Sequence, residues 1–147
     1  MNSALTFTGS PYTSFMHETK VTLSNGIELH VEIGGQPEHP AIMLIMGLGA
    51  QLLFWPDFFC KSLIDQGYRV IRFDNRDIGL SSKIRHSGPR LNTFKLMGRF
   101  ALGLENQGAP YNLYDMAEDA ALLIDHLELD NVSVLGASMG GMIAQIL

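Results

Sequence analysis

Two short stretches near the start of the chain alternate apolar and polar residues. Residues 20–24 and 27–33 show the two-residue period of a strand with one buried face, and Asn25-Gly26 lies between them. Asn-Gly favours the tight turn of a β-hairpin. The pattern therefore predicts an antiparallel hairpin, with His30 on its outward-facing, polar side.

Three later strands are predicted at wider intervals. Residues 41–46 form a continuous apolar run, which is typical of a strand buried on both faces. Residues 68–73 and 132–135 predict two more strands. Helices are expected between and after them, in this order: Pro56 to Gly67, a short one at 91–102, 112–127 with Asn112 as its cap, and one from Met139 onward. This alternation predicts an α/β fold with a mixed, mainly parallel sheet and helical crossovers.

The sequence Gly136-Ala-Ser-Met-Gly140 joins the last predicted strand to the last predicted helix. Gly-x-Ser-x-Gly between a strand and a helix is the pattern of a nucleophile elbow, a sharp turn that exposes the serine hydroxyl. Gly136 and Gly140 would let the strand and the helix approach closely. We therefore expect Ser138 to be a catalytic nucleophile. The alternative is a glycine-rich turn in which the serine is incidental.

A second glycine-containing loop, residues 46–50, follows the apolar strand 41–46. Acyl transfer through a serine needs two N–H donors for the oxyanion of the tetrahedral intermediate. At an elbow these come from the residue after the nucleophile, here Met139, and from the loop after the third strand, where we expect Leu48. The alternative is a glycine turn that leads into a helix.

The other residues with reactive side chains fit structural roles better. Asp74 and Asp77 precede the elbow in the chain, whereas the triad acid should follow the serine, so we expect them to hold a turn through an Asp–Arg pair and hydrogen bonds to the backbone. Among five histidines only His86 lies in a loop that could approach Ser138. Cys60 is expected to pack in the core. For Phe54 and Trp55 two alternatives stay open, core packing and lining of an acyl pocket.

Composition excludes several classes of protein. The net charge of −5, without a basic stripe, argues against nucleic acid or an anionic membrane as a partner. One cysteine excludes an internal disulfide, and no metal-site spacing or nucleotide-binding motif is present, so neither metal nor cofactor is expected. No signal peptide or membrane-spanning run is recognisable, and a cytoplasmic location is expected.

Taken together, four segments resemble the α/β-hydrolase superfamily, in particular its serine esterase-like branch that includes anthracycline methylesterases. The segments are Met46–Gln51 with Trp55-Pro56, Phe73–Ser81, Tyr111–Asp119 and Gly136–Gln145. The resemblance implies an N-terminal half of that fold, truncated after the elbow, with residues 1–18 as an extension and 19–147 as an incomplete core domain. It also implies Ser138 as nucleophile and Leu48 and Met139 as oxyanion donors.

The expected function is that of a cofactor-free serine hydrolase acting on small carboxylic esters through an acyl-enzyme. The acid and the histidine would come from a C-terminal half, in the same chain or in a second one. Two alternatives stay open: a non-catalytic fragment or scaffold that associates through an open sheet edge, and perhydrolase or C–C-bond hydrolase chemistry on the same triad.

Overall fold

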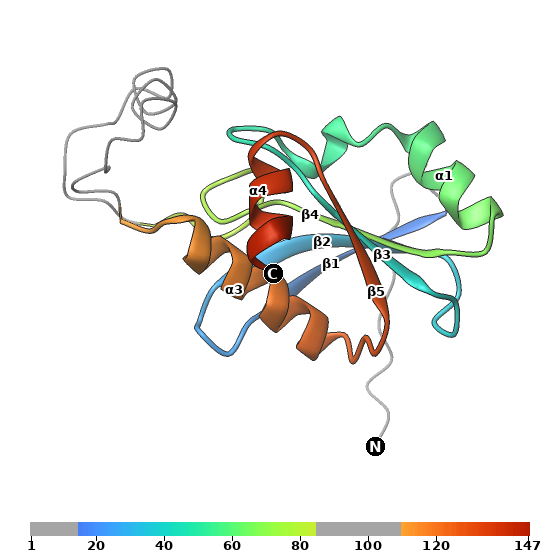
Figure 1. The fold of residues 1–147 in the computed structure, drawn as a ribbon, viewed down its shortest axis with the longest axis horizontal. Helices are drawn as coiled ribbons and strands as arrows, with labels where there is room; N and C mark the ends of the chain where they lie inside the picture. The colour runs from blue at the N-terminus through green and yellow to red at the C-terminus, as the bar shows by residue number, and fades with distance from the viewer. Residues whose placement is uncertain (1–14, 85–109) are drawn as a thin grey trace.

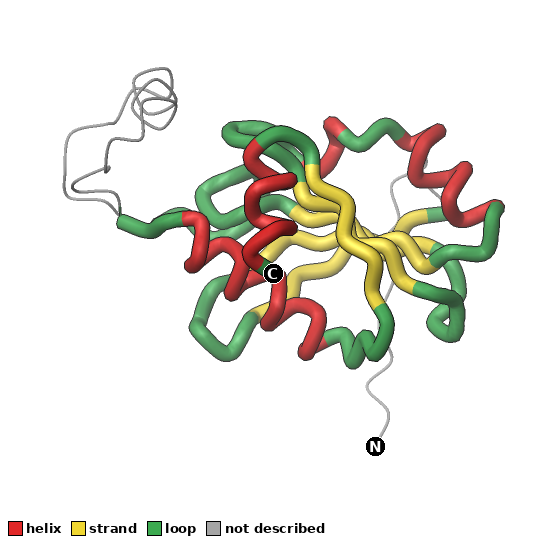
Figure 2. Tube along the Cα trace, viewed as in Figure 1, coloured by secondary structure: helices red, strands yellow, loops and turns green. Residues whose placement is uncertain are grey.

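A mixed sheet organises the part of the chain that the structure describes (Figure 1, Figure 2). The computed structural model describes residues 15–84 and 110–147, and within them the five strands lie in the order β1-β2-β4-β3-β5. The elements are β1 (Met16–Thr22), β2 (Glu28–Gly34), β3 (Ala41–Ile45), η1 (Leu52–Phe54), α1 (Asp57–Asp65), β4 (Arg69–Phe73), α3 (Leu113–His126), β5 (Val132–Gly136) and α4 (Met139–Ile146). The helix expected at 91–102 lies outside the described residues.

The predicted hairpin is formed by β1 and β2, which pair antiparallel from Met16↔Gly34 to Thr22↔Glu28. A three-residue loop closes it, because the Leu23 N–H donates to the Ile27 carbonyl oxygen. Gly26 takes a φ of +84° there, a conformation that glycine adopts without strain. β1 begins at Met16, earlier than the alternating pattern indicated.

The other three strands, β4, β3 and β5, run parallel to one another. α1 connects β3 to β4, and α3 precedes β5, so helical crossovers join the parallel strands as predicted. β2 pairs antiparallel with β4 and thereby attaches the hairpin to the parallel strands. The carboxyl ends of β3, β4 and β5 consequently lie at the same end of the sheet, and the loops that follow these strands gather there.

The helices cover both faces of the sheet (Figure 1). α3 and α4 pack together on one face, over apolar side chains such as Met43 and Ile45 of β3. α1 packs on the other face, where Leu44 of the same strand is buried with Cys60. Because β3 alternates its side chains between two covered faces, its whole sequence is apolar, as the continuous run 41–46 indicated.

α3 has a strong start signal that the sequence shows directly. The Asn112 side chain accepts hydrogen bonds from the Tyr114 and Asp115 N–H groups, while Asp115 accepts from the Asn112 N–H. This reciprocal capping box satisfies donors that a helix start leaves unpaired. Among the described residues, no helix combines the length and the apolar character needed to cross a membrane.

Candidate active site

Ser138 lies in the turn between β5 and α4 with an unusual backbone conformation. Its φ of 54° and ψ of −122° are rare for a residue with a side chain, and such strain persists only where the surrounding structure imposes it. The residue is exposed, and its hydroxyl does not cap α4. A strained turn with an exposed serine hydroxyl is the geometry of a nucleophile elbow.

The two glycines flanking Ser138 allow this turn to be so tight. A Cβ on Gly136 would overlap the Gly140 carbonyl, and a Cβ on Gly140 would overlap the Ile45 carbonyl at the end of β3. The backbones of β5, α4 and β3 therefore approach one another more closely than any side chain permits. The two elbow glycines from the sequence lie where this close approach occurs.

The loop after β3 lies directly beside Ser138. A Cβ on Gly47 would lie 3.1 Å from the Ser138 Cβ and 3.6 Å from its Oγ. The Ala137 N–H donates to the Ile45 carbonyl oxygen at 3.0 Å, which ties the elbow to the end of β3. Within residues 15–84 and 110–147, neither the Leu48 N–H nor the Met139 N–H donates a hydrogen bond to the protein. Two unpaired backbone donors thus lie on the segments that meet at Ser138.

The turn after β4 is held by buried polar side chains, as the sequence indicated. The Asp74 carboxylate accepts from the Leu52 N–H at 2.8 Å and the Leu80 N–H at 3.0 Å, and Asp77 accepts from the Ile84 N–H at 2.6 Å. Both aspartates are therefore engaged in the turn, and neither bonds to Ser138.

The arginine of this turn pairs across the fold. Arg76 donates from Nε and Nη2 to the two carboxylate oxygens of Asp119 on α3, both at 2.6 Å. Asn25 of the hairpin loop also donates to Asp119, at 2.9 Å. The expectation of an Asp–Arg pair within the turn was wrong, because Arg76 pairs with Asp119 of α3 and so joins the turn, α3 and the hairpin. The partner of Arg76 could not be chosen from the sequence.

His30 corrects the sequence-based expectation of an outward side chain. It is 6% exposed, and its ring nitrogens lie 3.0 Å from Asp74 Oδ2 and 2.9 Å from Glu18 Oε1. The hydrogen bond to Asp74 raises the pKa of His30 against the opposing effect of burial, and Glu18 adds to the rise. The carboxylates of Glu18 on β1 and of Asp74 in the turn after β4 explain the inward position, because they satisfy both nitrogens of a buried ring.

No described histidine lies in reach of Ser138. His39 precedes β3 and His126 precedes β5, so both belong to the amino ends of the parallel strands, opposite the elbow. His17 lies on β1, at the far edge of the sheet, and His30 on β2 is separated from β5 by two strands. His86 lies outside the described residues.

The aromatic residues after the loop divide between surface and core. Phe54 is 69% exposed, whereas the Trp55 ring stacks on Phe59 of α1 at 5.7 Å between centroids. Cys60 is buried in the same layer, and burial raises the pKa of its thiol, which leaves it unreactive. The core position expected for Cys60 is confirmed.

Sequence reasoning missed a buried ion pair in this layer. Arg72 on β4 is fully buried, and its guanidinium lies 2.6 Å from Glu32 on β2 and 2.8 Å from Asp57 on α1. Charged residues on neighbouring strands were the available signal, because a buried arginine needs carboxylates within reach.

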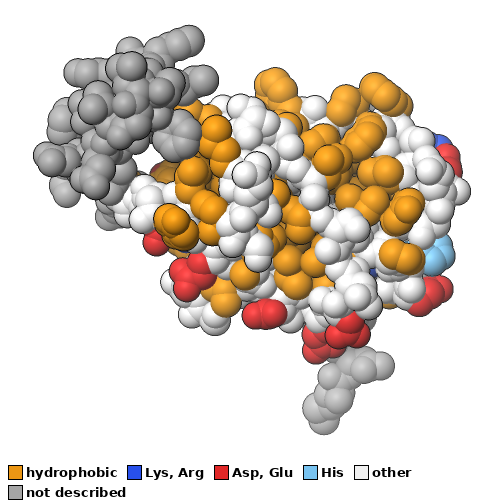
Figure 3. All heavy atoms as spheres, in the orientation of Figure 1, with side chains coloured by type: hydrophobic (Ala, Val, Ile, Leu, Met, Phe, Trp, Pro, Cys, Tyr) orange, Lys and Arg blue, Asp and Glu red, His pale blue; other side chains and the backbone are white. Residues whose placement is uncertain are grey.

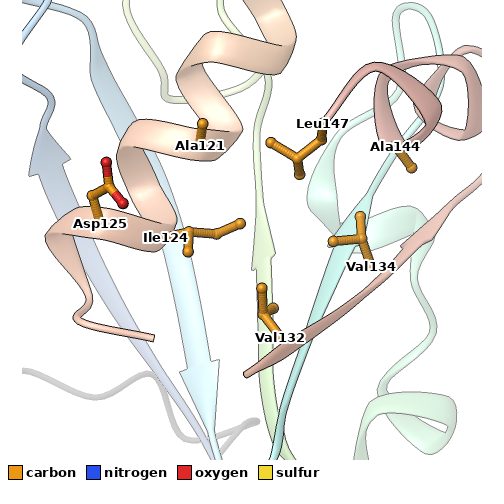
Figure 4. A pocket seen from close by; sticks show the side chains of 7 residues that line it. All are labelled: Ala121, Ile124, Asp125, Val132, Val134, Ala144 and Leu147. Atoms are coloured by element: carbon orange, nitrogen blue, oxygen red, sulfur yellow. The ribbon is translucent and has the colours of Figure 1, made fainter. Parts of the chain in front are cut away.

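A groove of about 380 Å³ lies between α3, β5 and α4 (Figure 4). Its side chains are Ala121, Ile124, Asp125, Val132, Val134, Ala144 and Leu147. β5 pairs only with β3 among the described strands, so its other edge is unpaired. Figure 3 shows hydrophobic side chains gathered on this face of the molecule. The apolar groove adjoins an open strand edge.

Comparison with known sequences places this geometry in a family. Residues 40–147 match the profile of the alpha/beta hydrolase fold family. Rhodomycin D methylesterase DnrP from Streptomyces peucetius is 30% identical over 129 residues, which cover 88% of this chain and 37% of the methylesterase. The chain therefore spans less than two fifths of that relative.

Solved structures agree in fold. A hydrolase from Pseudomonas aeruginosa PA01 superposes with a TM-score of 0.64 at 27% identity. The match covers 87% of this chain and 39% of the hydrolase chain. The enol-lactonase from Burkholderia xenovorans LB400 gives a TM-score of 0.63 at 26% identity. This match covers 85% of this chain and 39% of the enol-lactonase chain. The chain belongs to the alpha/beta hydrolase fold family.

Proposed function

We propose that this chain carries the nucleophile half of a serine hydrolase that cleaves carboxylic esters. The observation that carries the proposal is the arrangement at Ser138: a strained, exposed serine beside a loop, with N–H groups at Leu48 and Met139 that have no acceptor among the described residues. The chain is similar to a methylesterase and to an enol-lactonase, and both names denote an enzyme that cleaves an ester bond. This similarity supports ester hydrolysis as the reaction class.

In the proposed reaction the Ser138 Oγ attacks the ester carbonyl carbon, and its proton passes to a histidine. The carbonyl oxygen becomes an oxyanion, which accepts from the Leu48 and Met139 N–H groups. Collapse of this intermediate releases the alcohol and leaves an acyl group on Ser138, which water then hydrolyses. Each backbone donor of this kind contributes about 2.7–4 kcal/mol to stabilising the transition state.

The histidine and the acid would come from a C-terminal half of the same fold, in the same polypeptide or in a second one. The unpaired edge of β5 and the apolar groove beside it are the surfaces that such a half would cover. The same open edge also favours a second candidate, a scaffold that associates through β5 without catalysis. Perhydrolase or C–C hydrolase chemistry would use the same Ser138.

The test is labelling with a fluorophosphonate probe, together with hydrolysis of short p-nitrophenyl esters. The chain should react strongly once the C-terminal half completes it. The 147-residue chain alone should turn over about 10⁴- to 10⁶-fold more slowly, because no histidine of residues 15–84 and 110–147 lies in reach of Ser138 to act as the base. Ser138→Ala should abolish labelling, whereas Ser133→Ala, an exposed serine on β5, should not.

Two results would contradict the proposal. Robust turnover by the 147-residue chain that depends on Ser138 would mean that the base lies within it. A completed, folded protein that stays unlabelled, or carries its label elsewhere, would exclude the serine hydrolase and leave the scaffold.

A further inference from the structure

The loop of residues 47–51, which carries the Leu48 N–H, is held at both ends by one dipeptide. At its start, Asn75 Nδ2 donates to the Met46 carbonyl oxygen at 3.0 Å. At its end, the Leu52 N–H donates to Asp74 Oδ1 at 2.8 Å. Asp74 and Asn75 directly follow β4, and each is only 2% exposed. A loop of five residues is therefore fixed through two adjacent buried side chains.

Asp74 is itself held in one orientation. Its second oxygen, Oδ2, accepts from the Leu80 N–H and lies 3.0 Å from His30 Nδ1. Any side chain at Gly79 would overlap this carboxylate. Burial favours the neutral form, but the hydrogen bonds from His30, Leu52 and Leu80 prevail and lower the pKa of Asp74. A charged carboxylate with these donors has no freedom to rotate.

Within the described residues, the loop has few other contacts that fix it: the Phe54 N–H donates to the Gln51 carbonyl oxygen at 3.0 Å, and Gly47 lies beside Ser138. Gly47 and Gly49 contribute no side chain, and its internal hydrogen bond, from the Ala50 N–H to the Gly47 carbonyl oxygen, is long at 3.3 Å. An oxyanion donor must be held within about 0.5 Å of its working position before the reaction begins. Anchors at residues 46 and 52 provide that restraint from outside the loop.

Building on the function proposed above, we propose that Asp74 and Asn75 are positioning residues of the oxyanion site. Neither of them hydrogen-bonds to Ser138, and both act by holding the loop that carries the Leu48 N–H. His30, between Asp74 and Glu18, fixes the Asp74 carboxylate in turn. A purely structural role would stabilise the whole fold instead of this loop.

The first test measures amide hydrogen exchange in the 147-residue chain, with Asn75→Ala and Asp74→Asn as variants. Exchange across residues 47–52 should accelerate about tenfold, the effect of losing one buried hydrogen bond, while the hairpin and α3 keep their protection. The control is Asp77→Asn, which changes a carboxylate of the same turn that binds Ile84 and not the loop. It should leave exchange at 47–52 unchanged.

Two exchange results would overturn the proposal. One is that amide exchange at residues 47–52 stays unchanged in Asn75→Ala or Asp74→Asn when that variant folds. The other is an equal loss of protection throughout the sheet in both variants, because the dipeptide would then support the fold as a whole. This measurement does not use the reactivity of Ser138, so it is independent of the proposed function.

The second test uses ester hydrolysis by the chain completed with its C-terminal half. Asn75→Ala should lower kcat about 10- to 100-fold with KM changed less than about twofold, because the donor acts in the transition state. Asp77→Asn should keep the native kcat. A rise in KM at constant kcat would overturn the positioning role. Absence of hydrolysis by the native completed protein would instead count against the proposed function.

Discussion

At the scale of single residues, the turn at Ser138 needs glycine on both sides, because a Cβ atom at Gly136 or Gly140 would overlap backbone atoms. Gly136 and Gly140 allow three backbone segments to meet at Ser138, and no flexible side chain is available there to move aside. Protein interiors are packed so densely that one added methyl group is felt. The turn should therefore respond sharply to substitutions that would be mild elsewhere.

Gly140→Ala and Gly141→Ala provide a matched pair in the same helix. At Gly140 the new Cβ would overlap the Ile45 carbonyl of β3, so we expect a loss of about 1–3 kcal/mol in the free energy of unfolding. At Gly141 the nearest atom lies 3.3 Å away, and the higher helix propensity of alanine, about 1 kcal/mol, offsets the contact. Urea unfolding followed by circular dichroism measures both. Equal losses would contradict the explanation.

His30 gives the fold a predictable dependence on pH. Its folded-state pKa is raised above 6.5, so its contribution to stability is complete below pH 6.5 and is lost as the pH rises through the folded-state pKa. The free energy of unfolding should therefore fall as the pH is raised from 6.5. His30→Gln should flatten this part of the profile, whereas His126→Gln, at an exposed position on α3, should preserve it. An unchanged profile in His30→Gln would contradict the assignment.

At the scale of elements, one carboxylate joins three segments. Asp119 on α3 receives Arg76 from the turn after β4 and Asn25 from the hairpin loop. Arg76 also donates to the Asp115 carbonyl oxygen and lies 5.3 Å from the centre of the Tyr111 ring. The start of α3 is thereby fixed against the edge of the sheet that carries the candidate site.

Asp119→Asn should cost about 3–5 kcal/mol of unfolding free energy, because it leaves the Arg76 charge buried without its partner. Asp65→Asn is the control, since it breaks the exposed Lys61–Asp65 pair of α1, which is worth about 0.5 kcal/mol at most. Denaturant titration of both variants measures the difference. A loss of less than about 1 kcal/mol in Asp119→Asn would show that the Arg76–Asp119 pair adds little.

Elements with one strong local signal were predictable from the sequence. The Asn112 cap, the apolar run of β3 and the Gly-x-Ser-x-Gly turn each place their causes within a few residues. His30 and Arg72 were not, because their burial depends on carboxylates from other strands, from the turn after β4 and from α1. The polar turn after β4 was recognised as structural, but its link to the Leu48 loop needed the structure. The division of the chain into an extension, residues 1–18, and a core domain, residues 19–147, stays a prediction.

At the scale of the whole molecule, the two edges of the sheet differ in kind. β1 carries His17, Glu18 and Lys20, charged or polar residues of the type that discourages further strand pairing. β5 carries no charge, and its Leu135 is 42% exposed. The β5 edge is therefore where association is expected, whether with a C-terminal half or between copies.

The chain by itself should consequently not behave as a monomer. Light scattering should show association that increases with concentration, and Leu135→Lys should reduce it by placing a charge on the open edge. Leu80→Lys, at a 57% exposed leucine in the turn after β4, is the control and should leave association unchanged. A native chain that stays monodisperse over the whole concentration range would contradict this expectation.

In the function proposed above, the oxyanion donors at Leu48 and Met139 are main-chain N–H groups. Every residue except proline carries such a group, so a substitution at either position would retain the proposed donor while it changes the side chain. The proposed oxyanion site therefore places little constraint on which side chains occupy these two positions.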